Sequence, residues 1–266
     1  MICAMEGHAV RKILKNKPLV EAIFELQWEL RGKAFSGEKI DPHHRIFVTR
    51  LEEEAVKDYP VPKPLPAADV PEKFVPHKVQ QQFWTAENEW PVVQVGPGII
   101  TLNDTVKYDW EDFKERMSHL LDLFFETHPD SDDLNLNTVM LRYINAIEFD
   151  YNNDDVLKFL KEKMKITIDI QPDLFCGRGV SKLPYSFNLQ TFFPSMNPEG
   201  AVGLVARRGQ KNEKDVLFWE IMVQSIGKYV PKTIKEDILV WAENAHSLIR
   251  DWFFGIIEGD LLKEFE

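Results

Sequence analysis

Two glutamates near the N-terminus are the first residues whose type and spacing could do chemistry. Glu21 and Glu25 lie four positions apart in Pro18–Leu30, where apolar and polar residues alternate. Because such alternation is typical of a half-buried β-strand, both carboxylates are expected on one face, about 13 Å apart. Glycosidase carboxyl pairs lie roughly 5–10 Å apart, so this spacing argues against a simple catalytic dyad.

A second polar group lies in a similar stretch, 138–150. Arg142 is expected on the face that matches Glu25, so the two could form a cross-strand ion pair if their strands are neighbours. Tyr143 and Asn145 share the opposite, apolar face, where a buried amide usually makes structural hydrogen bonds. Two interpretations stay open for this group, a structural network and a polar ligand-binding site. It consists of Glu21, Glu25, Arg142, Tyr143 and Asn145.

The elements that must position these groups follow the same order twice. The first half is predicted to contain strand 18–30, a helix from Asp41-Pro42 to Tyr59, strands 80–85, 90–95 and 99–103, and a helix capped by Asp109. The second half is predicted to contain strand 138–150, helix 153–165, strands 186–193, 201–207 and 216–223, and a closing helix to about 258 with a capping box at Thr233–Glu236.

This order, β-α-β-β-β-α twice, predicts an α+β protein with an architectural repeat. Pairing of the two long strands would join two antiparallel sheets into one curved sheet with the helices on one face. That arrangement resembles the duplicated fold of the TATA-binding-protein class. The predicted organisation is a flexible lead-in at 1–17, halves at 18–135 and 136–266, and one compact domain.

Composition narrows the class of protein. The chain has 266 residues and a net charge of −11, and 1–135 carries −8 of it. Because nucleic-acid footprints are basic, nucleic acid is the least favoured partner. Cys3 and Cys176 lack ligand-spaced neighbours, so no disulfide framework, zinc site or cofactor is predicted. We expect a cytoplasmic protein without a membrane span or signal peptide.

The segment 60–76 contains six prolines. Such a segment is extended and semi-rigid, and we expect that it continues no helix and does not sit inside a sheet. It either crosses the surface as a connection or offers a proline-rich docking site.

Several short motifs, spread over about 16–265, resemble a sporadically distributed prokaryotic protein family of unknown function. The motifs are Lys17-Pro-Leu-Val-Glu-Ala-Ile-Phe-Glu25, Gln94-Val-Gly-Pro-Gly98 with Leu102-Asn103, Tyr108-x-Trp110-x-x-Phe113, Leu141-Arg-Tyr-Ile-Asn145 and Ala245-His246. The resemblance implies no catalytic residues. Ala146 stands where it implies a basic residue.

No common catalytic motif is present, and three functions remain. The first is a binding protein that uses the open face of the curved sheet or a dimer interface, with a second copy or another protein as partner. The alternative is an enzyme of unrecognised type, with a polar pocket around Glu21, Glu25 and Arg142. The third is nucleic-acid binding through the saddle of the sheet, whose expected face carries acidic residues.

Overall fold

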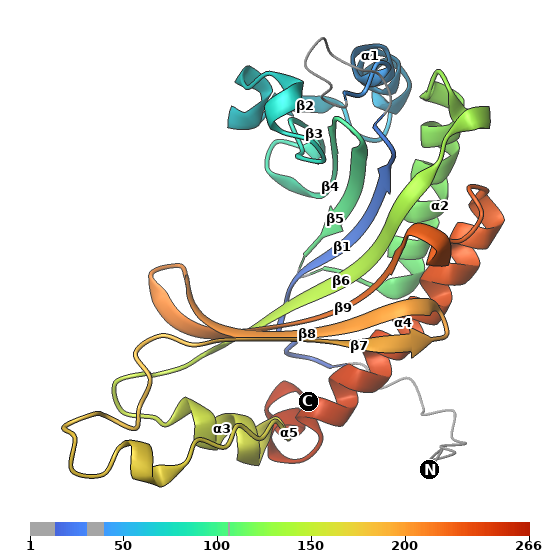
Figure 1. Ribbon diagram of the computed structural model, residues 1–266. Coiled ribbons are helices and arrows are strands. Elements are labelled where there is room, and N and C mark those ends of the chain that lie inside the picture. The colour runs from blue at the N-terminus through green and yellow to red at the C-terminus, as the bar shows by residue number, and fades with distance from the viewer. Residues whose placement is uncertain (1–13, 31–39, 106) are drawn as a thin grey trace.

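A computed structural model describes residues 14–30, 40–105 and 107–266. The fold is α+β and is built on one curved antiparallel sheet (Figure 1). Its nine strands lie in the order β2-β3-β4-β5-β1-β6-β9-β8-β7. Their bounds are β1 Leu19–Trp28, β2 Val61–Pro64, β3 Gln81–Ala86, β4 Glu89–Gly96, β5 Ile99–Asp104, β6 Leu136–Glu148, β7 Asn188–Met196, β8 Glu199–Lys211 and β9 Lys214–Ile226.

The two long strands are neighbours, as their matching patterns predict. β1 and β6 pair antiparallel at the centre of the sheet, with Phe24 opposite Leu141 and Ile23 opposite Arg142. β1 alternates buried and more exposed residues, and the buried Phe24 lies opposite the buried Leu141, so these apolar side chains share one face. The order β5-β4-β3 continues from β1, and the order β9-β8-β7 continues from β6.

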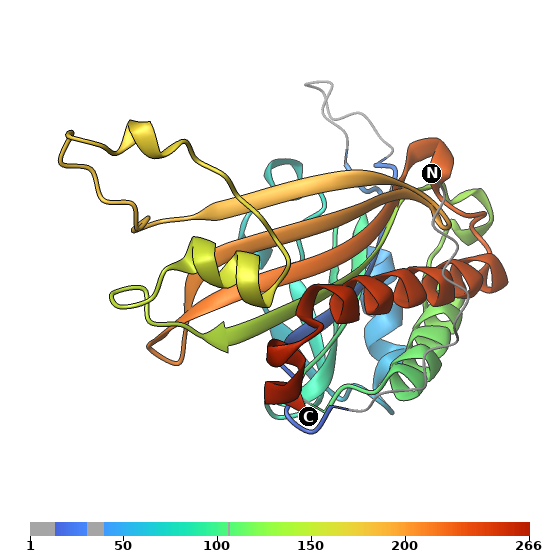
Figure 2. The same cartoon turned by 90° about the horizontal axis from the view of Figure 1, so that it is seen from below.

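Five α-helices are present in the described part of the chain. They are α1 His44–Ala55, α2 Trp110–Thr127, α3 Val156–Lys163, α4 Lys235–Ile257 and α5 Asp260–Phe265. Buried side chains from all five join one hydrophobic core with the apolar face of the sheet. Figures 1 and 2 show α2 and α4 lying along the same side of the sheet. We call the opposite side of the sheet the open face.

The core begins at the alternating residues of β1. Phe24 and Leu26 are fully buried, and the Trp28 ring packs on Phe47 of α1 and Phe124 of α2, with centroid distances of 5.8 and 5.4 Å. Burial of aromatic side chains of this size is a large part of the driving force for folding.

Asp41 has another role than the predicted helix cap. α1 begins three residues later at His44, and its N-cap, His43, makes no side-chain hydrogen bond to the helix. The Asp41 carboxylate is buried and accepts hydrogen bonds from the Trp28 indole and the Gly98 backbone N–H, at 3.1 and 3.0 Å. It therefore joins strand β1 to the β4–β5 turn.

The proline-rich segment does not sit inside the sheet, but it contributes a strand at the sheet's edge, which the sequence did not predict. Val61–Pro64 forms β2, which pairs with β3 at one end of the sheet. Edge strands tolerate proline because one side of the strand needs no N–H donor. The 3-10 turns Pro66–Asp69 and Glu72–Phe74 follow β2.

The helix ends also differ in part from the sequence predictions. Asp109 caps α2 as predicted, since its side chain accepts hydrogen bonds from the backbone of Glu111 and Asp112. The predicted capping box at Thr233–Glu236 is wrong, because the N-cap of α4 is Ile234, which makes no side-chain hydrogen bond to the helix. The short helix α5, which follows α4, was not predicted from the sequence.

The end of the lead-in lies against the body of the protein. Residues 1–13 of the predicted lead-in, including Cys3, are outside the described residues. Leu14 is buried, the Asn16 N–H donates to the Phe265 carbonyl, and the Lys17 ammonium donates to the Tyr108 carbonyl. None of the helices in the described ranges is long and apolar enough to cross a bilayer.

Candidate binding face

The predicted site residues divide between the two faces of the central strands. Glu21 and Glu25 of β1 lie on the open face, where Arg142 of β6 reaches the same surface opposite Ile23. Tyr143 and Asn145 of β6 point into the helix-covered core. The five residues therefore lie on two paired strands but form two separate groups, one on each face of the sheet.

Glu21 is held by an amide from the neighbouring strand. Its Oε1 accepts a hydrogen bond of 2.7 Å from Asn103 Nδ2, and the Asn103 carbonyl oxygen accepts one of 2.6 Å from the Thr101 hydroxyl. Thr101 and Asn103 are only 3% and 5% exposed although they lie on the face opposite the helices. This part of the open face is therefore a fixed, largely desolvated network of hydrogen bonds.

Burial works against the charge of both glutamates. The pKa of Glu21 is raised from its usual value mainly by burial, although the Asn103 hydrogen bond and the Arg142 charge oppose this shift. Burial also raises the pKa of Glu25, whose Oε1 accepts a 2.6 Å hydrogen bond from Gln27. The fold thus keeps two carboxylates on its open face in surroundings that disfavour their ionised form.

The ion pair of Arg142 differs from the predicted one. Its Nη2 lies 2.7 Å from Glu220 Oε2 on β9, so the predicted Glu25–Arg142 ion pair is wrong. The other Glu220 oxygen lies 3.3 Å from Arg207 Nη2 on β8. Register places both carboxylates diagonal to Arg142, which is directly opposite Ile23 of β1 and Met222 of β9, and the guanidinium reaches the carboxylate on β9.

Glu220 is the central residue of this second network. It is 4% exposed and bridges two guanidinium groups. The Arg207 guanidinium also lies over the Phe218 ring, 4.8 Å from its centroid. A buried carboxylate that contacts two guanidinium groups fixes the positions of both arginines.

Tyr143 belongs to a buried cluster on the helix-covered face. Its hydroxyl lies 2.5 Å from the Tyr108 hydroxyl and 2.7 Å from His246 Nδ1 on α4. The His246 ring stacks on Trp110 at 3.9 Å between centroids. Burial raises the pKa of both tyrosines, so both remain neutral hydroxyl groups. Three motifs that are far apart in the sequence therefore meet here.

Asn145 is also on the core face. It is 2% exposed, lies opposite Trp219 of β9, and its amide nitrogen has no hydrogen-bond partner among the described residues. The Trp219 indole N–H likewise has no partner among them. Two buried donors on adjacent strands can share one acceptor, such as a buried water molecule.

Sequence reasoning missed Thr101, Asn103, Arg207 and Glu220 as members of the candidate face. Glu220 lies in a predicted strand, and its polar type between apolar neighbours is a signal that could have been used. Asn103 was known only from the resemblance to a family motif. These side chains meet across β5, β1, β6 and β9. The sequence does not give the order of strands in the sheet, so it could not show which polar residues would be neighbours.

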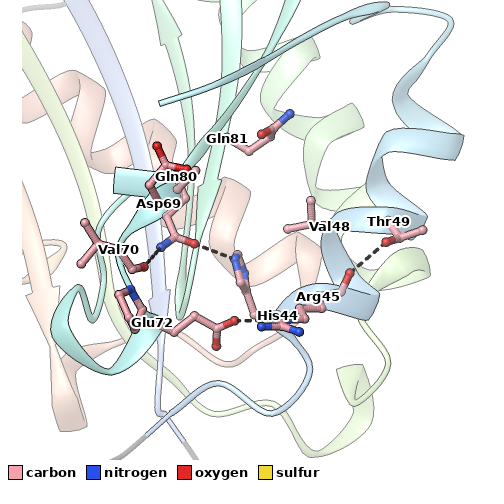
Figure 3. A pocket seen from close by; sticks show the side chains of 11 residues that line it. His44, Arg45, Val48, Thr49, Asp69, Val70, Glu72, Gln80 and Gln81 are labelled. Atoms are coloured by element: carbon pink, nitrogen blue, oxygen red, sulfur yellow. Dashed lines mark hydrogen bonds and ion pairs between the residues drawn. The ribbon is translucent and has the colours of Figure 1, made fainter. Parts of the chain in front are cut away.

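Three surface hollows lie away from the two glutamates. The first, of about 620 Å³, lies between α1 and the turns after β2. His44 and Gln80 line it and are joined by a hydrogen bond (Figure 3), in which His44 Nε2 lies 3.2 Å from the Gln80 side-chain oxygen. Burial lowers the pKa of His44. The second lies between α2 and the start of α4, and the third beside the β7–β8 turn.

In the ranges that the structure covers, no group of three His, Cys, Asp or Glu side chains could hold a metal ion. Cys176 is a free, exposed thiol. No family model and no curated protein matches the chain. The resemblance to a prokaryotic family therefore stays a prediction.

Proposed function

We propose that this chain is a cytoplasmic binding protein whose open sheet face holds a ligand or partner. One observation carries the proposal: Glu21 and Glu25 are kept on that face although burial raises the pKa of both. Ionised groups in such surroundings cost stability, and costs of this kind concentrate at functional sites.

The chemistry of the face indicates what it would bind. Glu21, Glu25 and Glu220 carry three carboxylates, while Arg142 and Arg207 carry two guanidinium groups, and Glu220 already pairs with both arginines. Glu21 and Glu25 each accept one hydrogen bond from an uncharged amide and keep further acceptor capacity. A ligand that presents amine, guanidinium or amide donors would complement them.

The alternative is an enzyme that uses the same carboxylates. The raised pKa values of Glu21 and Glu25 favour it, because general acids need such shifts. Their spacing along β1 opposes a direct dyad, so a catalytic role would fall to one carboxylate with Arg142. Nucleic-acid binding is the least favoured function, because Glu21 and Glu25 would face the phosphates.

We also propose that the sheet consists of two β-α-β-β-β-α halves related by an approximate twofold axis between β1 and β6, as in the TATA-binding-protein class. The matching strand orders on either side of this pair support the proposal. Among the described residues no strand beyond β7 corresponds to β2, so the halves would differ at the two sheet ends. The likeness concerns architecture, and function does not follow from it.

Native mass spectrometry of the purified chain, with the absorbance ratio at 260 and 280 nm, tests the function. We expect a bound species that is lost from the variant Glu25→Gln/Arg142→Met and retained by Val240→Lys, a change of similar size on an exposed position of α4. A species retained equally by both variants, or no bound species, would contradict the proposal. Turnover of a retained small molecule would favour the enzyme.

A further inference from the structure

The end of the sheet at β7 is a free strand edge in the described structure. β7 pairs with β8 along nine positions and has no partner strand on its outer side among the described residues. The strand has no charged residue, and all of its residues except Pro194 keep a backbone N–H. Natural edges are usually short or charged, so an uncharged edge of this length is a template for another strand.

Large apolar side chains gather beside this edge. Phe192 is 43% exposed and Met196 is 84% exposed. Together with Phe193 and Tyr229 they line the third hollow, which measures about 500 Å³. Exposed aromatic residues and methionine are enriched at protein interfaces.

The segment that leads into β7 also exposes large apolar side chains. Residues 169–186 extend away from the body of the protein (Figures 1 and 2), and we call them the arm. Tyr185 of the arm is 89% exposed, while its carbonyl accepts a hydrogen bond from Arg208 that ties the arm to β8. Other exposed apolar residues of the arm are Ile170, Leu174, Val180 and Leu183.

We propose that two copies of this chain pair through their β7 edges, antiparallel, about a twofold axis near Phe192. This axis places Asn188 opposite Met196 of the partner subunit. Tyr185, three residues earlier, then lies beyond the β7–β8 turn of the partner subunit, whose hollow lies beside that turn. The inference deepens the proposed interaction function and rests on the view that the chain acts by binding.

Symmetry and charge favour a second copy over another occupant. A twofold interface needs a surface that complements itself, and an antiparallel edge does so because each strand offers the same donors and acceptors. The pairing brings the basic end of one edge, with Lys182 and Arg207, toward Glu199 of the partner subunit. A net charge of −11 opposes contact elsewhere, while β7 itself is uncharged.

Light scattering coupled to size-exclusion chromatography of the full chain tests this pairing. We expect about twice the monomer mass of 31.0 kDa. Phe192→Lys should weaken the dimer at least about tenfold, because two lysines would face each other at the axis. Val240→Lys should leave the mass unchanged. Circular dichroism spectra and thermal melts would show that both variants remain folded.

Disulfide formation locates the axis. In a Cys3→Ser/Cys176→Ser background, Phe192→Cys should cross-link two copies under mild oxidation, because a disulfide needs Cα atoms within about 7 Å. Met196→Cys, four residues from the axis, should not. A monomer at all concentrations, a dimer unaffected by Phe192→Lys, or equal cross-linking at both positions would overturn the pairing.

The test of the β7 pairing can succeed or fail independently of the test of the open-face site. If the pairing is correct, the variant Glu25→Gln/Arg142→Met keeps the dimer mass whether or not it loses a bound species. A dimer without a ligand on the open face would therefore support the pairing and contradict the open-face site. A monomer that retains its ligand through Glu25 and Arg142 would do the reverse.

Discussion

The central strands β1 and β6 have one face packed with aromatic and aliphatic side chains and another face built from ion pairs and amides. On the packed face Phe24 is fully buried, and Tyr143 bonds to groups from α4 and from the segment before α2. On the open face Glu21 and Glu25 carry a burial cost, and Glu220 binds two arginines. Burial favours folding on the packed face, whereas on the open face it acts against the charge of two carboxylates.

Adjacent residues of β1 give the sharpest test of this difference. Phe24→Ala should destabilise the protein by about 3–5 kcal/mol, because it removes a buried ring and leaves a cavity. Ile23→Ala, on the partly exposed open face, should cost less than about 2 kcal/mol. Urea unfolding at pH 7 measures both values. Similar costs for the two variants would show that the open face is packed as tightly as the core.

The alternation of polar and apolar residues predicted these two faces from the sequence. Glu21 and Glu25 are four positions apart, so a pleated strand must place both on the same face, and the structure does so. The pairing of the long strands followed from their equal length and pattern. The sequence pattern at the start of α2 also predicted the Asp109 cap correctly. The similar pattern at Asp41-Pro42 did not, because the Asp41 carboxylate accepts hydrogen bonds from the Trp28 indole and the Gly98 backbone N–H.

The partners of the polar residues could not be predicted in the same way. Whether Arg142 meets Glu25 or Glu220 depends on registers between three strands, and one position of shift changes the answer. The Tyr143–His246 bond joins residues 103 positions apart and depends on how α4 lies on the sheet. Such contacts are set by packing, which a single sequence does not specify.

Glu220 tests whether the open-face network is held together as a unit. Glu220→Gln should cost about 1–2 kcal/mol, because both guanidinium groups lose a charged acceptor while solvent reaches them in part. A double-mutant cycle with Arg142→Met measures the coupling between the two residues. Arg250→Met, on the exposed side of α4, is the control, and no coupling between Glu220 and Arg142 would contradict the network.

Tyr143→Phe probes the buried cluster on the packed face with a single atom removed. The Tyr108 hydroxyl and His246 Nδ1 each lose a hydrogen-bond partner, which should cost about 1 kcal/mol. The ring stays in place, so the α-helical circular dichroism signal should not change. Chemical denaturation gives the difference, and Tyr185→Phe, on an exposed side chain, should have no effect.

Glu25→Gln should have the smallest effect, and its sign should be opposite to that of the others. Because burial raises the Glu25 pKa above 4.5, the folded state binds more protons than the unfolded state just above that pH, and wild-type stability falls as pH rises through the raised value. The variant lacks this titration and still accepts the Gln27 hydrogen bond. Its melting temperature should exceed that of wild type by about 2 °C at pH 7 and match it near pH 4.

Thermal melts of both proteins across this pH range measure the difference, with Glu53→Gln on the exposed surface of α1 as the control. A Glu25→Gln variant that is less stable than wild type at pH 7 would mean that the ionised carboxylate stabilises the fold. In that case Glu25 would be a structural member of the Arg142 network. The ionised Glu25 carboxylate would then stabilise the fold, as the buried side chains of the packed face do, and would not lower its stability.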